Sequence, residues 1–128
     1  MKRILIVDDV PGWIRFHITN INYLGIEDLE IDTASCAIEG VSKIEASIDR
    51  PYDLIFTDLQ MENNFLPKLA GQWFVEQIKT YKEYKNSKIV IVSASPSIKR
   101  IAENLGVLYL PKTVVRSSDA EIYKQFIL

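Results

Sequence analysis

Short apolar runs alternate along the chain with longer segments in which apolar residues recur at helical spacing. Each run has four or five residues, is rich in Ile, Leu and Val, and mostly lacks polar alternation. Such runs predict strands that are covered on both faces. The runs are residues 4–7, 29–33, 54–57, 89–92 and 107–110. Helices are predicted at residues 13–24, 37–48, 71–84, 98–105 and 119–126.

Strict alternation of strands and helices is typical of a parallel sheet with right-handed crossovers and helices on both faces. We therefore expect an α/β, flavodoxin-like, three-layer sandwich with five helices and a five-stranded sheet of order 2-1-3-4-5. The 128 residues are close to the size of one domain, about 150 residues, so residues 1–128 are expected to form a single domain.

Composition excludes several classes of protein. Fifteen basic and 17 acidic residues give a net charge of −2, which offers no electrostatic footprint for nucleic acid. The apolar runs are far shorter than the roughly 20 residues that span a bilayer, and the basic start meets two aspartates too early for a secretory signal. Cys36 is the only cysteine, so no internal disulfide is possible and a cytoplasmic location is expected.

Polar side chains follow the predicted strands at the edge where parallel strands end. Asp8 and Asp9 follow the first run, Asp58 the third, Ser93 the fourth and Lys112 the fifth. In order 2-1-3-4-5 the first and third strands are neighbours at the point where strand order reverses, so the three carboxylates converge. Packed carboxylates need a cation or a proton, and Mg²⁺ suits oxygen ligands and leaves positions for phosphate oxygens. An aspartate beside Mg²⁺, a lysine and a hydroxyl is equipped to attack phosphorus.

The chain resembles the receiver domains of bacterial two-component response regulators, the CheY-like superfamily. The matching segments are residues 2–9, 52–61, 90–94 and 106–112, with a weaker match at 34–40. They contain, in the family's order, the acidic pair, the strand-end aspartate, Ser93-Ala94 and Pro111-Lys112. Five elements in the right order on the right strands are far more specific than an acidic pair alone.

The resemblance implies the following roles. Asp58 would be the phosphoacceptor. Mg²⁺ would be bound by Asp8, Asp9, Asp58 and the backbone carbonyl of Gln60. Ser93 and Lys112 would contact the phosphoryl group, and Tyr109 would change rotamer when Ser93 moves toward that group. The chain would accept the group from a histidine kinase or a histidine phosphotransfer protein and catalyse its own phosphorylation and slow dephosphorylation, without being a conventional enzyme. The signal would reach a protein target through a surface formed by residues 98–105, 107–110 and 119–126. The protein would act as a monomer or as a phosphorylation-linked dimer, and no output domain is expected in these 128 residues.

Four features depart from the family pattern. Gly71 follows Asp58 by 13 residues, where the family has its glycine after about eight, so residues 61–70 form an enlarged loop beside the site. Glu62 stands where the family has Pro, and Thr113 stands where it has Pro after the lysine. The helix at 98–105 has only about two turns.

Two alternatives remain. A binding module of the same fold that signals without phosphorylation would account for the altered loop and for Thr113. A haloacid-dehalogenase-type hydrolase also uses a strand-end aspartate, but it needs a second acid two residues later, where this chain has Val10 and Gln60. Taken singly, Asp9 is typical of a helix cap, and Ser93, Tyr109 and Lys112 of ordinary packing or solvation; only their combination favours a site.

Overall fold

Five parallel strands form one sheet in the order β2-β1-β3-β4-β5 in the computed structural model, which describes residues 1–128. The strands are β1 Lys2–Val7, β2 Leu29–Ala34, β3 Leu54–Thr57, β4 Lys88–Ser93 and β5 Leu108–Pro111. The three inner strands are almost wholly buried, as unbroken apolar runs require. The predicted α/β fold and strand order are confirmed.

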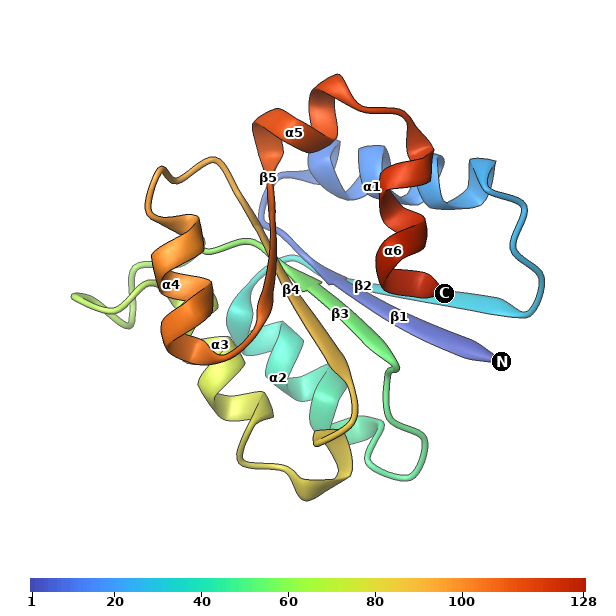
Figure 1. The fold of residues 1–128 in the computed structure, drawn as a ribbon. Coiled ribbons are helices and arrows are strands. Elements are labelled where there is room, and N and C mark those ends of the chain that lie inside the picture. The colour runs from blue at the N-terminus through green and yellow to red at the C-terminus, as the bar shows by residue number, and fades with distance from the viewer.

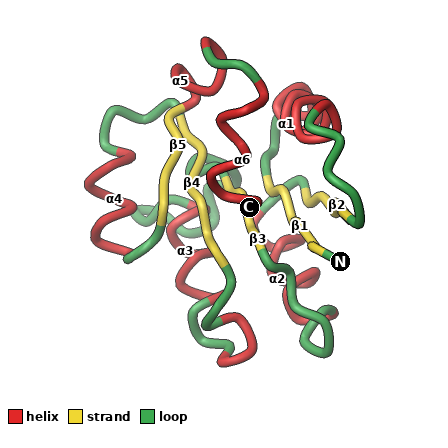
Figure 2. Tube along the Cα trace, turned by 45° about the vertical axis from the view of Figure 1, so that its right-hand side comes forward, coloured by secondary structure: helices red, strands yellow, loops and turns green.

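Helices cover both faces of this sheet (Figures 1 and 2). On one face lie α1 (Pro11–Tyr23), α5 (Lys112–Ser117), the 3₁₀ helix η2 (Ala120–Tyr123) and α6 (Lys124–Ile127). The other face carries α2 (Ala37–Ala46), α3 (Ala70–Ile78) and α4 (Ile98–Leu105), with the 3₁₀ helix η1 (Lys82–Tyr84) between α3 and β4. None of these helices has the length and apolar character needed to cross a bilayer.

Alternation along the strands divides the core into two clusters. Leu5 and Val7 of β1 point into the cluster under α2, α3 and α4, while Ile4 and Ile6 point into the cluster under α1 and the C-terminal helices. This follows from the two-residue period of a strand, which sends neighbouring side chains to opposite faces. Both faces of the sheet are therefore covered by apolar side chains, so a polar functional site can form only at the edges of the sheet.

The prediction of five helices is wrong, because the structure contains six α-helices. The predicted helix at 119–126 is divided into η2 and α6, and α5 begins at Lys112, directly after β5. Thr113, Val114 and Val115 are β-branched and weak helix formers, so no periodic signal predicts α5. Val115 is buried in the core, and this tertiary packing outweighs local propensity. The bond after Lys112 is trans, since the single cis peptide joins Leu66 and Pro67.

His17 of α1 is buried within an aromatic cluster. Its ring stacks on Phe56 at an interplanar angle of 9°, and its Nδ1 lies 2.6 Å from the Tyr123 hydroxyl oxygen. Burial, followed by the nearby positive charge of Lys112, lowers the pKa of His17 from 6.5 to about 4. The folded protein therefore keeps this imidazole neutral under conditions in which an exposed histidine takes up a proton.

The free energy of unfolding should therefore fall as the pH decreases from 6.5 toward 4. In that window His17 of the unfolded chain binds a proton that the folded chain does not, which costs up to about 3 kcal/mol. Urea unfolding of the wild type and of His17→Gln at a series of pH values measures this effect. The stability advantage of the wild type should shrink in acid, while groups common to both proteins, including Asp58, cancel; parallel curves would contradict the prediction.

Candidate functional site

The pairing of β1 with β3 places two aspartates side by side at the carboxyl edge of the sheet. Val7 lies opposite Thr57 in the register, so Asp8 and Asp58 leave neighbouring strands at the same level. The Asp58 N–H donates to the Val7 carbonyl at 3.0 Å, and the Asp8 N–H donates to the Ala34 carbonyl at 3.1 Å. Ladder hydrogen bonds thus hold both backbones one residue beyond the strands.

The carboxylates of Asp8, Asp9 and Asp58 gather in one cluster. One oxygen from each lies within 4.8 Å of the other two. Asp8 and Asp58 are buried, whereas Asp9 is exposed to solvent. Backbone donors fix one oxygen of each buried carboxylate, because Asp8 Oδ1 accepts the Val10 N–H at 2.9 Å and Asp58 Oδ1 accepts the Leu59 N–H at 2.8 Å.

Lys112 joins the two buried carboxylates from the far side. Its Nζ lies 3.1 Å from Asp8 Oδ2 and 3.3 Å from Asp58 Oδ2. The Lys112 side chain is itself buried, and its ammonium also lies 4.7 Å from the centroid of the Trp13 ring. This aromatic face favours the cation while shielding it from water. The helical spacing of residues 13–24 predicts either packing or a surface contact for Trp13, and it gives no sign that Trp13 lies beside Lys112.

Three carboxylates and one ammonium leave the cluster with a net negative charge. The pKa of Asp58 is raised from 3.8 to about 6, chiefly by burial; Lys112 acts in the opposite direction, and the charge of Asp8 adds to the rise. A cation among these oxygens would favour the ionised form of Asp58. The donor set consists of hard oxygen ligands, one of them solvent-exposed, which suits a divalent cation that retains some of its water.

The other predicted site residues, Ser93, Tyr109 and Gln60, make no side-chain hydrogen bond or ion pair with the three carboxylates. Ser93 is buried at the end of β4, and its Oγ accepts a hydrogen bond from the Ser95 N–H at 3.1 Å rather than contacting Asp58. Tyr109 is half-buried in β5 opposite Ile91, and it packs against the core cluster under α4. Gln60 is exposed in the loop that follows Asp58.

The enlarged loop between β3 and α3 is held by contacts with two helices, α2 and α3. In Figure 1 it extends outward from the sheet at the far left of the view, beyond α3. Near its start, Glu62 accepts the first two N–H groups of α2, from Ala37 at 2.7 Å and from Ile38 at 3.1 Å. Farther along, the ring of Phe65 stacks on Trp73 of α3 with centroids 4.1 Å apart. The Glu62 contact spans 25 residues of sequence, so no local pattern indicates it.

Glu62 therefore acts as a cap for a helix in another part of the chain. Although partial burial acts to raise the pKa of this carboxyl, the N–H groups of Ala37 and Ile38 hold it below its ordinary value. A negative charge at a helix N-terminus is favourable, because it meets unpaired N–H groups and the positive end of the helix dipole. The loop after Asp58 is thereby attached to the helix that follows β2.

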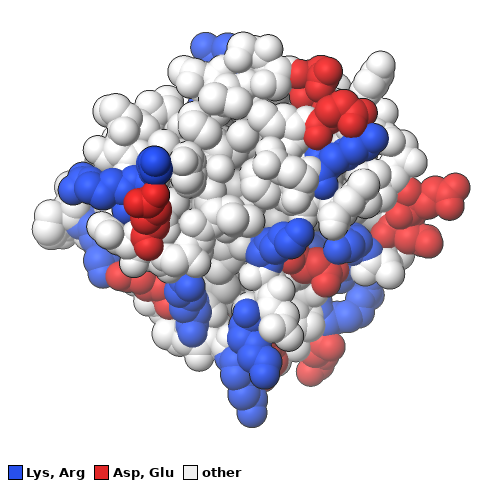
Figure 3. All heavy atoms as spheres, viewed as in Figure 1, with Lys and Arg blue, Asp and Glu red and all other residues white.

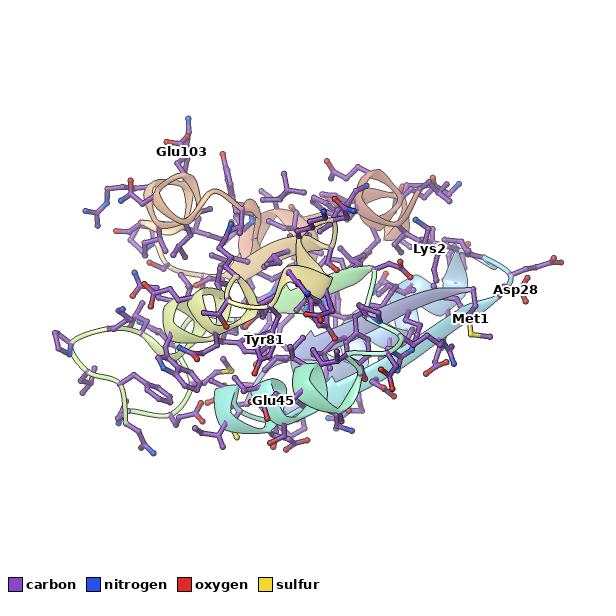
Figure 4. All side chains as sticks on the ribbon, turned by 90° about the horizontal axis from the view of Figure 1, so that it is seen from below. Met1, Lys2, Asp28, Glu45, Tyr81 and Glu103 are labelled. Atoms are coloured by element: carbon purple, nitrogen blue, oxygen red, sulfur yellow. The ribbon has the colours of Figure 1, made fainter.

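Glu62→Ala is expected to lower the free energy of unfolding by about 1–2 kcal/mol, because two N–H groups of α2 lose their acceptor. Glu62→Gln keeps one acceptor oxygen and should lose less. Glu103→Ala is a matched control, since Glu103 points away from α4 into solvent (Figure 4) and should change stability by less than about 0.5 kcal/mol. Urea denaturation of the three variants measures these differences, and equal losses for Glu62→Ala and Glu103→Ala would contradict the capping role.

No family model and no curated protein matches the chain, but solved structures do. A two-component response regulator from Clostridium difficile has 22% identity and a TM-score of 0.73, covering 98% of this chain and 91% of that one. A CheY-like receiver domain protein from Methanospirillum hungatei JF-1 has 22% identity and a TM-score of 0.69, covering 98% and 89%. A response regulator from Burkholderia pseudomallei with a phosphorylated aspartic acid, a calcium ion and citrate has 17% identity and a TM-score of 0.71, covering 100% and 67%. The chain therefore has the fold of CheY-like response regulator receiver domains.

Proposed function

We propose that residues 1–128 form a receiver domain of a two-component system, which takes a phosphoryl group onto Asp58 with the help of Mg²⁺. The observation that carries the proposal is the position of Asp58, a buried carboxylate clustered with Asp8 and Asp9 and held 3.3 Å from Lys112. The Burkholderia neighbour, which holds a phosphorylated aspartic acid and a calcium ion on the same fold, supports it.

The chemistry follows from the ionised Asp58 side chain. One of its carboxylate oxygens attacks the phosphorus of a phosphohistidine, the phosphorus–nitrogen bond breaks, and an acyl phosphate forms as the donor histidine recovers its electron pair. Lys112 would neutralise charge on the transferred oxygens. Asp8, Asp9, Asp58 and the Gln60 carbonyl would hold Mg²⁺, which supplies further neutralisation of the phosphoryl group. The donor would be a histidine kinase or a histidine phosphotransfer protein in the cytoplasm.

The response would begin at Ser93. A phosphoryl group on Asp58 would offer the proton of the Ser93 hydroxyl a charged acceptor, whereas at present the Ser93 Oγ accepts from the Ser95 N–H. Movement of the end of β4 would then make room for the ring of Tyr109. The surface formed by α4, β5 and the helices after β5 would change its shape and bind or release a target protein, as a monomer or as a phosphorylation-linked dimer.

The decisive experiment is the intact mass of the protein after incubation with a small-molecule phosphodonor, with and without Mg²⁺. Wild type should gain one phosphoryl group only when Mg²⁺ is present, and Asp58→Asn should gain none. Asp49→Asn, which removes an exposed carboxylate outside the cluster, should behave as wild type.

A different result would favour the alternative of a phosphorylation-independent binding module with this fold. The absence of an adduct, under conditions that modify a control receiver, would overturn phosphorylation on Asp58. An adduct that persists in Asp58→Asn would overturn the assignment of the acceptor. The observation that supports the alternative is the loop after Asp58, which Glu62 fastens to α2 and which exposes Leu66.

A further inference from the structure

The largest cavity of the molecule lies far from the carboxylate cluster, at the amino edge of the sheet. It is a groove of about 600 Å³ between the end of α3, η1 and the amino ends of β4 and β5. Its volume falls in the range of sites that bind small molecules or short peptide segments, about 300–1,000 Å³. The parallel strands point their carboxyl ends away from it, so the groove and Asp58 occupy opposite edges of the sheet.

Four lysines line the groove, and no carboxylate does. Lys79, Lys82, Lys85 and Lys88 are all exposed, and none of them takes part in an ion pair. The Lys88 ammonium points to the other face of the sheet, where it donates to the Phe126 carbonyl at 3.2 Å, so Lys79, Lys82 and Lys85 supply the positive charge of the groove. Lys and Arg side chains gather along the lower edge of the face in Figure 3, over the segment that joins α3 to β4. In a chain of net charge −2, this is a local concentration of positive charge.

The floor of the groove is apolar. Ile78 and Ile89 are buried beneath it, and Val107, which directly precedes β5, forms its side. A simple inorganic anion would use only the lysines. The combination of lysines and an apolar floor suits an anionic ligand that also carries an apolar side chain.

The two tyrosines of the groove, Tyr81 and Tyr84, already make hydrogen bonds within the protein. The Tyr81 hydroxyl donates to Glu45 of α2 at 2.8 Å, and Figure 4 shows these two side chains next to each other. Tyr84 is buried, and its hydroxyl donates to the Ile44 carbonyl at 3.1 Å. Single-stranded nucleic acids bind through bases stacked on accessible aromatic faces. The buried ring of Tyr84 and the tethered ring of Tyr81 therefore favour a peptide over a nucleic acid.

We propose that this groove, which we call the lysine groove (Lys79, Lys82, Lys85 and the apolar floor between them), binds an acidic segment of a partner protein. Aspartate and glutamate side chains of the segment would meet the ammonium groups of Lys79, Lys82 and Lys85, and a leucine-like side chain would pack on Ile89 and Val107. The inference does not depend on phosphorylation, because nothing in the groove contacts Asp58.

Fluorescence anisotropy with a labelled peptide of alternating Glu and Leu tests the proposal. The comparison peptide carries Gln in place of each Glu. Wild type should bind the acidic peptide and not the neutral one. Lys79→Glu/Lys82→Glu should weaken binding by about tenfold or more, because two attractions become repulsions. The control Lys99→Glu/Arg100→Glu makes the same change of charge on exposed residues of α4 and should weaken binding by less than about twofold.

Asp58→Asn should bind the peptide as wild type does, which separates this result from the fate of the proposed phosphorylation. Urea midpoints confirm that each double variant is folded, and Lys79→Gln/Lys82→Gln provides a milder pair if the charge reversals unfold the chain. Equal binding of the acidic and neutral peptides, or equal losses in the two double variants, would overturn the proposal. Tighter binding of a single-stranded oligonucleotide of the same formal charge would overturn it in favour of nucleic acid.

Discussion

Gly71→Ala is expected to destabilise the protein by about 3 kcal/mol or more, which makes it the most damaging small substitution in the chain. A Cβ on Gly71 would lie 2.6 Å from the Cα of Leu59 and closer still to the Asp58 carbonyl oxygen. The Gly71 N–H already donates to the Leu59 carbonyl at 2.9 Å, so the two backbones are in direct contact. Backbone atoms cannot rotate aside as the end of a side chain can, and the strain would fall on the segment that carries Asp58.

Gly12→Ala is the matched control for this effect. Gly12 lies in α1, and the nearest atom that its Cβ would meet is the terminal nitrogen of Arg15 at 3.9 Å. Alanine should therefore stabilise the protein there by about 0.5–1 kcal/mol, because it loses less backbone entropy than glycine on entering a helix. Urea denaturation of both variants measures the difference. Similar stabilities for Gly71→Ala and Gly12→Ala would show that α3 can move away from Leu59 at little cost.

Lys112→Met should change two properties of the site in opposite directions. Phosphorylation by a small-molecule donor should slow by about 100-fold or more, because no ammonium remains to neutralise the transferred oxygens. Binding of Mg²⁺ should tighten, since removal of a positive charge 3.1 Å from Asp8 and 3.3 Å from Asp58 leaves the carboxylates more strongly negative. Time courses of intact mass measure the first effect. Fluorescence of Trp13, whose ring lies beside Lys112, reports the second at a pH near 8.

Lys124→Met provides the control, because Lys124 pairs with Glu121 on the surface at 3.0 Å and lies outside the cluster. It should leave both the rate and the Mg²⁺ affinity unchanged. If Lys112→Met merely unfolded the chain, rate and affinity would fall together. If the rate stayed within about twofold of wild type, Lys112 would have no part in the proposed transfer.

Lys112→Met tests a position that the sequence predicts, whereas Gly71→Ala tests a contact that only the folded structure shows. Lys112 follows the last apolar run, and the rule that parallel strands end at one edge is enough to predict that it meets the aspartates. Gly71 also stands out in the sequence, as the residue that opens a helix after an enlarged loop. The reason for a glycine there is the close approach of α3 to Leu59, and that approach exists only once the chain has folded.

The Glu62 cap and the helix α5 could not be predicted from the sequence either, because both depend on contacts between distant segments. Glu62 departs from the expected Pro, but its partners on α2 are 25 residues away and carry no side-chain signal, since the donors are backbone N–H groups. The helix α5 has β-branched residues where helical propensity is weak, and it forms because Val115 packs into the core. In both cases a contact between distant segments decides the local structure.

By itself the sequence determined the α/β class and the five strands, because apolar runs and crossover rules act along the chain. The common doubly wound order 2-1-3-4-5 then predicted the edge at which Asp8, Asp58 and Lys112 gather. Only the tertiary structure decided the sixth helix, the Glu62 cap, the approach of Gly71 and the lysine groove. Each of these depends on side chains or backbone groups brought together from separate elements. The spacing of Lys79, Lys82 and Lys85 in the sequence is typical of a solvated stretch. Only the folded structure places these lysines around an apolar floor formed by Ile78, Ile89 and Val107.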